Sequence, residues 1–584
     1  MKNKKIKRLW INSLEVEEVR KGFNSLLDNS KDLLMYEEAK ARQISDWLVG
    51  MNASQLYSLL MHEKGVNMTL SVGRVQSPLC YLIYQRQKEI EQFVSKPFFE
   101  LVGEFKTANG MYMGKAKNIR TDTIEPLQSF VEDNGCLLDS EISGMVVSVE
   151  KKEKRVKSPK LHSLSTLQTV ANKKWKYSPA KVLEVMQSLY EKKLVTYPRT
   201  DSNYITENEF LYLVENLERY KELLNVTFEA NLKVNKRYVD NSKVQVHYAI
   251  IPTKTIPSDT NLNGLTTEEK SIYEEIVLTT LAMFHRDYVY EETKILTSVN
   301  DIEFESIGKV EIDKGWKLLF TKSVEGIEKK EDDPVLPVVV VDEKVTSLLH
   351  SKEACTSPPK PYTEGGLINL MKTSGKMVED EEDSAILKEI EGIGTEATRA
   401  SIIETVKKNG YIDINKNIVS ITKKGELLCE AIHNTMLASP AMTAKWESYL
   451  KKIGEGSGTK EVFVAQTKRF ISDLLETAPA AMQEIETVSF AQEQQTDHFG
   501  SCPSCRKGTM IDRKTFIGCS NYRNGCKFTI NRTILGKKLT DKQVTDLLEK
   551  GTTSMIKGFT SKAGKSFDAK LTITDGKVSF VFEM

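Results

Sequence analysis

The stretch Leu194-Val195-Thr196-Tyr197-Pro198-Arg199-Thr200-Asp201-Ser202 is the most informative in the chain. Pro198 fixes its own φ and biases Tyr197 away from helix, so we expect the phenol on a turn. In an extended segment Arg199 points to the same side as Tyr197. A guanidinium can hold a phosphate oxygen, and a tyrosine can form a covalent ester. A plain Tyr-Pro turn with a surface arginine fits these nine residues as well, so their surroundings have to decide.

Bulk composition is that of an ordinary globular chain with several domains. The 584 residues are 40% hydrophobic and 28% charged, and this length suggests roughly three to five domains. No apolar run reaches the roughly 20 residues that cross a bilayer, and the basic N-terminus lacks the apolar core of a secretory signal. We therefore expect no membrane partner and a cytoplasmic location.

Because the net charge is +1, nucleic-acid binding would have to come from local patches. Charge alone leaves the basic stretch 151–160 open between a solvated linker and such a patch.

The order of hydrophobic patterns predicts nested domains. Residues 5–14 form an isolated strand, helical patterns cover 15–27, 31–60 and 76–93, and strands follow between 97 and 149. Helices return at 164–175, 179–192 and 267–284, strands resume from 288 to about 341, and helix continues from 363 to about 474. A linker rich in Ala, Glu and Gln at 475–495 precedes short strands after residue 500. A strand layer flanked twice by helical parts indicates that the chain leaves one domain and later returns to it.

Several ordered motifs around Tyr197 resemble those of the type IA DNA topoisomerases, the topoisomerase III branch in particular. They lie in collinear order between about residues 5 and 474, namely Asp46–Gln55, Leu70–Pro78, Pro159–Gln168, Gln187–Ser202, His247–Thr253, Thr363–Leu367 and Glu391–Ala400. The resemblance implies a multidomain α+β fold, the family's toroid of helical domains and a β arch. It also implies ATP-independent cleavage, passage and religation of single-stranded DNA through a 5′-phosphotyrosine, which would relax negative supercoils or decatenate DNA.

The same resemblance assigns the candidate site residues. Tyr197 would attack the DNA backbone, Arg199 would contact the scissile phosphate, and His247 would assist nearby, although a lone histidine is otherwise more often a packed or surface residue. The implied DNA-binding residues are Arg42, Asn52, Gln55, Ser71, Val72, Gly73, Arg74, Val75, Gln76, Thr200, Asp201, Thr395 and Arg399. Single-stranded DNA or a negatively supercoiled duplex is the expected partner.

Two of these DNA-binding motifs also carry a physical reason. Gly73 permits a close backbone approach, and the N–H groups of a helix start suit a phosphate, although a simple N-terminal cap fits the same residues. We expect Thr395 to cap the helix that runs through Val406. Arg399, in the first turn of that helix, opposes the helix dipole, which favours an anionic partner.

Four of the eight cysteines lie close together near the C-terminus. Cys502, Cys505, Cys519 and Cys526 form two knuckles whose thiolates fit a tetrahedral Zn²⁺. Their clustering argues for metal rather than disulfides, with four reduced thiols as the alternative. Residues 535–584 resemble the small β repeat that follows such ribbons in the family, and we expect an auxiliary DNA or protein contact there.

The acidic Toprim domain with which family members begin is not recognisable in residues 1–60, and only residues 5–14 resemble its last strand. Mg²⁺ is expected for the family, but its acidic ligands are missing from this sequence. Beside an active topoisomerase, two hypotheses therefore stay open: a truncated DNA-binding remnant, and half of a split enzyme whose Toprim part is a separate chain.

The resemblance also implies how the chain divides into domains. They are a Toprim remnant (1–15), helical base (16–95 and 346–480), β arch (96–157 and 289–345), tyrosine domain (158–288), linker (481–499), zinc ribbon (500–534) and β repeat (535–584).

Overall fold

The computed structural model describes residues 5–11, 16–244, 246–257, 264–323, 335–483, 485, 498–513, 515–561, 564–574 and 576–582. The chain divides into two compact units, Met1–Gly50 with Val72–Arg469 and Met51–Ser71 with Phe470–Met584. Most of the predicted linker 481–499 and the last residues of the predicted first strand lie outside the described residues. Within the described part of the chain, no helix combines the length and apolar character needed to cross a membrane.

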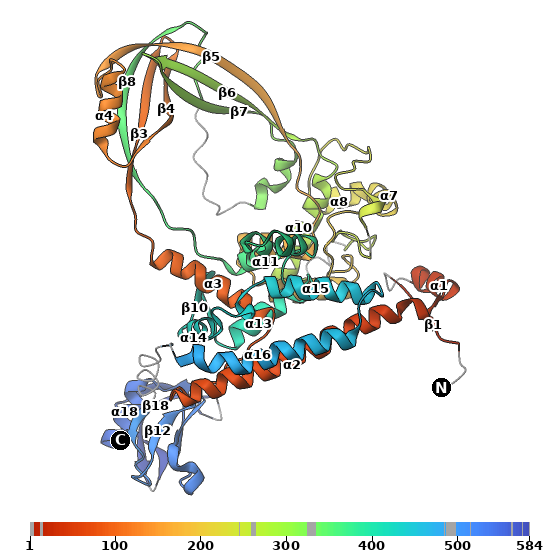
Figure 1. Ribbon diagram of the computed structural model, residues 1–584, viewed down its shortest axis with the longest axis vertical. Helices are drawn as coiled ribbons and strands as arrows, with labels where there is room; N and C mark the ends of the chain where they lie inside the picture. Colours follow the sequence, from red (N-terminus) through yellow and green to blue (C-terminus); the bar gives the residue numbers. More distant parts are fainter. Residues whose placement is uncertain are drawn as a thin grey trace. The chain divides into compact units, whose positions relative to one another are not determined.

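The N-terminal region is helical, as its pattern predicted (Figure 1). Its helices are α1 (Val16–Asn24), α2 (Leu33–Glu63) and α3 (Gln76–Glu91). The predicted first strand is much shorter than expected, because β1 comprises only Lys7–Arg8 and pairs antiparallel with β2, Leu27–Asp28. A strand persists only where a neighbour pairs with its backbone, and β2 offers two residues. The partner of β1 therefore follows it in the chain.

Six antiparallel strands close into a barrel in the order β3-β4-β7-β6-β5-β8 (Figure 1). The strands are β3 (Pro97–Thr107), β4 (Gly110–Thr121), β5 (Glu141–Val156), β6 (Tyr288–Val299), β7 (Ile302–Asp313) and β8 (Lys344–Cys355). Closure joins distant parts of the sequence, as in the pairing of Val102 with His350. The helix α4 (Ile124–Asp133) adds Leu127 and Val131 to the barrel core. Sequence patterns predicted most of the strands but neither α4 nor the closure.

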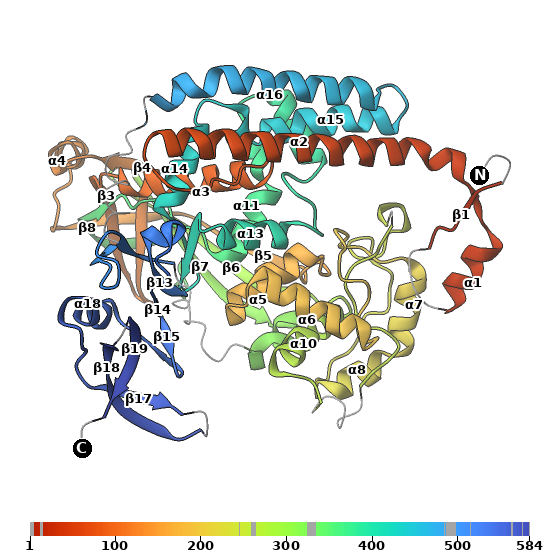
Figure 2. The same cartoon turned by 90° about the horizontal axis from the view of Figure 1, so that it is seen from below.

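Tyr197 belongs to a helical part inserted between β5 and β6. Its helices are α5 (Leu164–Trp175), α6 (Pro179–Glu191), α7 (Glu207–Glu215), α8 (Leu217–Leu223) and α10 (Thr267–Ala282). The side chains of Ser163 and Ser178 cap α5 and α6, which fixes where these helices begin. Figure 2 shows α5, α6 and α10 side by side, and a buried cluster that includes Leu167, Met186 and Ile276 joins them. The predicted ranges of these three helices agree with the structure.

The chain then returns to a second helical part. Its helices are α11 (Glu364–Lys372), α12 (Glu381–Glu389), α13 (Arg399–Lys408), α14 (Lys423–Ile432), α15 (Ala441–Gly454) and α16 (Lys460–Gln483). The hairpin of β9 (Ile412–Asn415) and β10 (Ile418–Ile421) was missed, because four-residue strands are too short for a periodic pattern. The linker predicted from residue 475 is wrong for 475–483, which are helical. Ala478 and Met482 are buried there and hold this segment in α16.

The C-terminal residues form two small modules that share one buried core. The first is a four-stranded antiparallel sheet of β11 (His498–Ser501), β12 (Thr509–Asp512), β13 (Phe516–Cys519) and β14 (Thr529–Asn531). The second contains β15 (Thr533–Ile534), β16 (Lys537–Lys538), α18 (Asp541–Lys550), β17 (Ile556–Thr560), β18 (Ser566–Thr574) and β19 (Lys577–Val581). The helix α18, which begins at a capping box on Thr540, was not predicted in this module.

Candidate active site and nucleic-acid interface

Backbone hydrogen bonds hold the Tyr197 loop between two neighbouring segments. Before the tyrosine, the Thr196 N–H donates to the Ile251 carbonyl at 3.0 Å. After it, the Leu164 N–H at the start of α5 donates to the Thr200 carbonyl at 3.0 Å. The loop is therefore fixed on both sides of Tyr197.

The Tyr197 phenol is half-buried between two other rings. The centroid of the His247 ring lies 4.3 Å from that of Tyr197, and the Tyr190 ring meets it edge-on at 5.7 Å. Burial, followed by the nearby Tyr197 oxygen, raises the pKa of Tyr190. The Thr200 hydroxyl donates to the His247 carbonyl at 3.5 Å and ties the two segments together. Among the described residues the Tyr197 hydroxyl makes no hydrogen bond, which leaves it available to a substrate.

Arg199 follows on the same loop with its charge unmatched. Its side chain is half-buried and forms no ion pair or hydrogen bond with any described residue. Thr200 is buried, whereas Asp201 is exposed. A guanidinium that stands two residues from a phenol and lacks a carboxylate partner suits a phosphate. The structure thus places Tyr197 in ring contact with His247 and keeps Arg199 on the loop that carries the phenol.

A cavity of about 550 Å³ lies in the first compact unit, between α2, the start of α3 and the segment before α13. Seven of the predicted DNA-binding residues line it, namely Arg42, Val72, Gly73, Arg74, Val75, Gln76 and Thr395. Val75, the N-cap residue of α3, makes no capping hydrogen bond with its side chain, and the positive end of the helix dipole lies at the cavity. The Arg42 side chain keeps 38% of its surface exposed although it pairs with Glu38 and Glu447. The structure therefore brings together motifs that the sequence separates by more than 300 residues.

Arg74 lines the same cavity, but three of its five N–H donors already bond to carboxylates. It is 7% exposed, and its guanidinium lies 2.8 Å from Asp46, 3.1 Å from Glu447 and 5.1 Å from the centre of the Trp446 ring. Burial opposes its charge, but the two carboxylates more than offset this and raise the pKa of Arg74. In this arrangement Arg74 supports the cavity wall, and its charge is already matched by two carboxylates.

Three predicted DNA-binding residues lie outside the first unit. Asn52 and Gln55 on α2, and Ser71 before α3, belong to the second compact unit. Gln55 is exposed, and the other two are half-buried. The structure does not group these three residues with the cavity.

Comparisons with known proteins agree with these motifs. A family model described as DNA topoisomerase matches residues 30–465, and a second one, the C-terminal repeat of topoisomerase, matches residues 525–583. The chain belongs to the type IA DNA topoisomerase family. The resemblance found in the sequence is therefore confirmed, and the protein is a DNA topoisomerase, an isomerase.

Relatives under two names match most of the chain. DNA topoisomerase 1 of Alkalihalophilus pseudofirmus is 33% identical, and the match covers 99% of this chain and 82% of the relative. DNA topoisomerase 3 of Bacillus subtilis is 31% identical over 91% of this chain and 72% of the relative. The solved structure of full-length topoisomerase I from Thermotoga maritima matches with a TM-score of 0.60 at 20% identity, over 98% of this chain and 82% of that one. This likeness confirms the multidomain α+β fold of the family.

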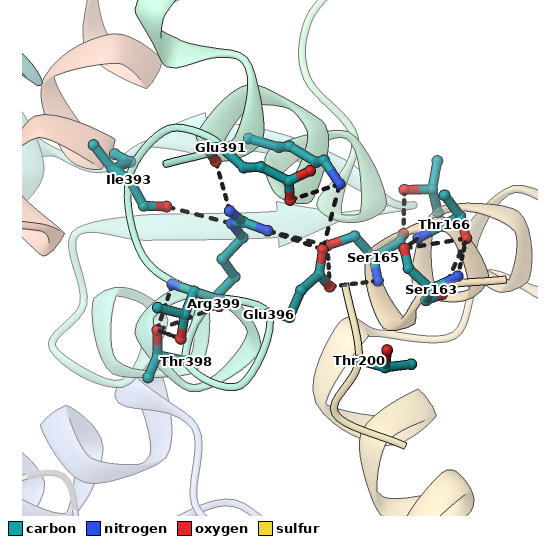
Figure 3. A network of polar contacts seen from close by, with 12 residues as sticks. Ser163, Ser165, Thr166, Thr200, Glu391, Ile393, Glu396, Thr398 and Arg399 are labelled. Carbon is teal, nitrogen blue, oxygen red and sulfur yellow. Dashed lines mark hydrogen bonds and ion pairs between the residues drawn. The ribbon is translucent and has the colours of Figure 1, made fainter. Parts of the chain in front are cut away.

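Arg399, another predicted DNA contact of this topoisomerase, is paired within the chain. Its side chain is 1% exposed, and Figure 3 shows it surrounded by groups of the same chain. The guanidinium donates to the Glu396 carboxylate at 3.1 Å, to the Ser165 hydroxyl at 3.3 Å and to the Glu391 carbonyl at 2.6 Å. Burial lowers the pKa of Arg399, and the charge of Glu396 opposes that change. In this arrangement the anion that faces Arg399 is Glu396, and the contact of Arg399 with DNA stays a prediction.

The start of the Arg399 helix also differs from the prediction. The helix α13 begins at Arg399, and Thr398 takes the N-cap position. Thr395, the predicted cap, lies one turn earlier and donates its N–H to the Thr398 hydroxyl at 2.9 Å. The segment from Thr395 to Thr398, which the sequence pattern assigned to the helix, forms this tight turn instead. Thr395 therefore lines the cavity.

The basic stretch 151–160 begins inside β5, which ends at Val156, and four of its six cations lie beside acids. Lys151 lies 3.1 Å from Glu291, and Arg155 lies 2.7 Å from Glu153. These ion pairs are exposed, so each contributes little stability. Their pairing favours a solvated surface over a dedicated DNA-binding patch.

The four C-terminal cysteines of this topoisomerase converge as a metal site requires. Their Sγ atoms all lie within 4.8 Å of one another, with 3.7 Å between Cys502 and Cys526 and 3.5 Å between Cys505 and Cys519. Tetrahedral Zn–S bonds of about 2.3 Å place sulfur atoms about 3.8 Å apart. A backbone hydrogen bond from the Lys507 N–H is the main cause that lowers the pKa of Cys505 to about 6. The cluster can therefore hold a metal ion.

The described residues do not provide a comparable site for Mg²⁺. Apart from the four cysteines, no group of three or more His, Cys, Asp or Glu side chains in the described ranges could hold a metal. On the Tyr197 loop, Asp201 is exposed and belongs to no such group, whereas Glu396 is buried and committed to Ser165 and Arg399. No step is therefore assigned to Mg²⁺ on these residues.

Proposed function

We propose that Tyr197 is the nucleophile with which this topoisomerase cuts one DNA strand. The observation that carries the proposal is a half-buried phenol without a hydrogen bond among the described residues, in ring contact with His247 and two residues before an unpaired arginine. The phenolic oxygen would attack the scissile phosphorus, bond to the 5′ phosphate end and release the 3′ hydroxyl. The reverse attack reseals the strand without ATP, because the phosphotyrosine ester conserves the broken bond.

Arg199 and His247 have separate roles in this proposal. Arg199 binds a non-bridging oxygen of the scissile phosphate and neutralises charge as the phosphorus is attacked. His247, packed on the Tyr197 ring, restricts the orientation of the phenol and borders the same phosphate. Thr200 and Asp201 continue along the DNA strand, with Thr200 fixing the loop through the His247 carbonyl.

The cavity beside α3 is the proposed binding site for the single strand. Arg42, the 72–76 segment and Thr395 present one half-exposed cation, a glycine and an uncapped helix start, a combination that suits a phosphate backbone. Asn52, Gln55 and Ser71, in the second compact unit, are proposed as further DNA contacts. The substrate is then single-stranded DNA, or the strands that separate in a negatively supercoiled duplex.

We further propose that a Toprim domain packs on the N-terminal elements and supplies the acidic residues. Apolar side chains near the N-terminus are strongly exposed, among them Ile6 (60%), Phe23 (59%), Leu33 (52%) and Tyr36 (57%). Such a group of exposed apolar side chains suits an interface with another domain. When bound, Mg²⁺ neutralises phosphate charge. The cysteine cluster would hold Zn²⁺, and the reduced thiols and the DNA substrate support a cytoplasmic location.

Transfer of label from an oligonucleotide tests the role of Tyr197. The full chain, with and without a separately expressed Toprim domain and Mg²⁺, is mixed with a single strand labelled at its 3′ or its 5′ end. We expect denaturation-resistant labelling of the protein from the 3′-labelled strand alone, because Tyr197 retains the fragment that carries the 5′ phosphate. Tyr197→Phe keeps the ring and removes the nucleophile, so it should take no label. Labelling of the Tyr197→Phe variant, or no labelling of the unaltered chain with Toprim present, would refute the proposal.

A further inference from the structure

Two parts of the protein meet at the helix α5: the part that carries Tyr197 and the helical part that begins at α11. The tyrosine-bearing part has its own buried cluster, made from residues between Leu161 and Leu319. Among the described residues of that cluster, none comes from the helical part that begins at α11. The contact between the two parts includes polar groups at both ends of α5, Ser165 near its start and Asn172 near its end.

Glu396 reaches across this contact to the first turn of α5 (Figure 3). One carboxylate oxygen accepts from the Ser165 N–H at 2.8 Å and from the Ser165 hydroxyl at 2.5 Å. A carboxylate at a helix N-terminus is favoured by the N–H groups and by the dipole. The other oxygen pairs with Arg399 at 3.1 Å and with Lys372 at 3.5 Å. One part of the protein thereby caps a helix of the other.

These groups are shielded from water. Ser165 is 4% exposed, Glu396 7% and Arg399 1%. Charge-assisted hydrogen bonds in such a setting are stronger than neutral ones, and leaving one partner unmatched is costly. Arg399 is also held to the loop before α13 by the Glu391 and Ile393 carbonyls. The charged half of the contact is therefore rigid before α5 docks on it.

The contact between Glu396 and Ser165 is connected to the loop that carries Tyr197. The residue before Ser165, Leu164, donates its N–H to the carbonyl of Thr200, three residues after Tyr197. If Tyr197 carries one end of a cut strand, a second strand can pass only when the tyrosine-bearing part moves away from the part that holds the other end. Every such passage has to break the contacts between Glu396 and Ser165.

We infer that Ser165, Glu396 and Arg399 form a latch that sets how often the tyrosine-bearing part of this topoisomerase opens. The inference rests on the proposed function of Tyr197 for its purpose, but the latch itself can be measured without cleavage. Glu396 is a positioning residue in this device, since it acts on the DNA gate through α5 and touches no substrate.

Single-molecule energy transfer tests the latch. Dyes are placed through unnatural amino acids at the exposed positions Glu215 and Lys408, one in each part, in the full Tyr197→Phe chain. Glu396→Gln keeps the shape but offers one acceptor where the carboxylate offers two, so Ser165 and Arg399 cannot both be satisfied. We expect a ratio of open to closed molecules about tenfold higher, equivalent to about 1.4 kcal/mol. Glu404→Gln, an exposed change on the same helix α13, should leave the ratio unchanged.

A double-mutant cycle separates a latch from general loosening. Ser165→Ala removes the hydroxyl and should raise the open ratio, while the double variant with Glu396→Gln should open little more than the stronger single variant. Purely additive effects, or an unchanged ratio in both single variants, would overturn the latch. The Tyr197→Phe background cannot cleave, so label transfer from the unaltered chain tests the proposed function independently. If label transfer fails while the cycle shows coupling, the latch stands and the role of Tyr197 falls.

Discussion

Replacing Gly365 by alanine would introduce a steric clash at the contact between α11 and α5. A methyl group at Gly365 on α11 would lie 2.5 Å from the Cβ of Asn172 on α5, whereas carbon atoms pack at about 3.5–4.0 Å. Asn172 cannot turn aside, because its amide donates to the Tyr177 carbonyl at 3.0 Å and exchanges two hydrogen bonds with Asn417 at 2.8 and 3.0 Å. We therefore expect α5 to shift by about 1 Å, which would break the pair of bonds to Asn417.

The size of the effect follows from those contacts. Two hydrogen bonds at about 1 kcal/mol each give about 2 kcal/mol, similar to the usual cost of an overpacked core. Alanine in a helix also gains up to about 1 kcal/mol over glycine. The adjacent variant Gly366→Ala controls for that gain, since a methyl group there meets only the Thr363 hydroxyl, at 3.0 Å. The difference between the two variants should therefore stay near 2 kcal/mol.

Hydrogen exchange followed by mass spectrometry measures this difference. Amides of α5 should exchange about 30-fold faster in Gly365→Ala than in Gly366→Ala, because about 2 kcal/mol less free energy opposes local opening. Amides in the barrel strand β3 should not distinguish the two variants. Equal exchange of α5 in both would refute the claim that α11 and α5 are in close contact at Gly365.

Three further predictions concern the site and its modules. Arg199→Ala should slow strand cleavage by about 10²–10³-fold with little change in oligonucleotide affinity, and equal cleavage rates would exclude a contact with the reacting phosphate. Arg42→Ala should weaken binding of a single-stranded oligonucleotide and reduce the slope of log K against log salt by about 0.7; an unchanged slope would remove Arg42 from the DNA path. Cys505→Ser should abolish zinc binding measured by atomic absorption, whereas exposed Cys355→Ser should keep it; zinc retained by the Cys505 variant would count against the ribbon.

Local signals in the sequence predicted the helices of the tyrosine-bearing part. Ser163 and Ser178 cap α5 and α6, and a periodic apolar face follows each cap, so range and type agree with the structure. Barrel closure depends instead on pairings such as Val102 with His350, which no local pattern records. The α18 helix was missed although the sequence carries its signals, a capping box on Thr540 and an apolar face that buries Val544 and Leu547. The division into nine segments stays a prediction.

The sequence predicted which residues lie at the site better than it predicted which groups those residues contact. The grouping of Arg42, the 72–76 segment and Thr395 in one cavity follows the motifs that the sequence singled out. Glu396 carried no signal of its own, since a single glutamate before a helix usually means a favourable dipole contact. Only the fold shows that it caps a different helix, α5, and that it satisfies Arg399. The helix dipole correctly predicted an anion beside Arg399. The sequence alone could not show whether that anion is a carboxylate of the same chain or DNA.

The chemistry of this contact also explains why a moving joint would use polar groups. Separating apolar faces exposes surface at a cost of about 25 cal/mol per Å² with no compensation from water. Hydrogen-bonded groups regain partners in water when they part, so their net contribution is small compared with their strength when shielded. The bonds of Ser165 to Glu396 and of Asn172 to Asn417 cross between the two parts, whereas the apolar cluster from Leu161 to Leu319 stays within one body. A permanent core on each side and a polar contact between them is the arrangement expected of two bodies that must separate and rejoin without unfolding.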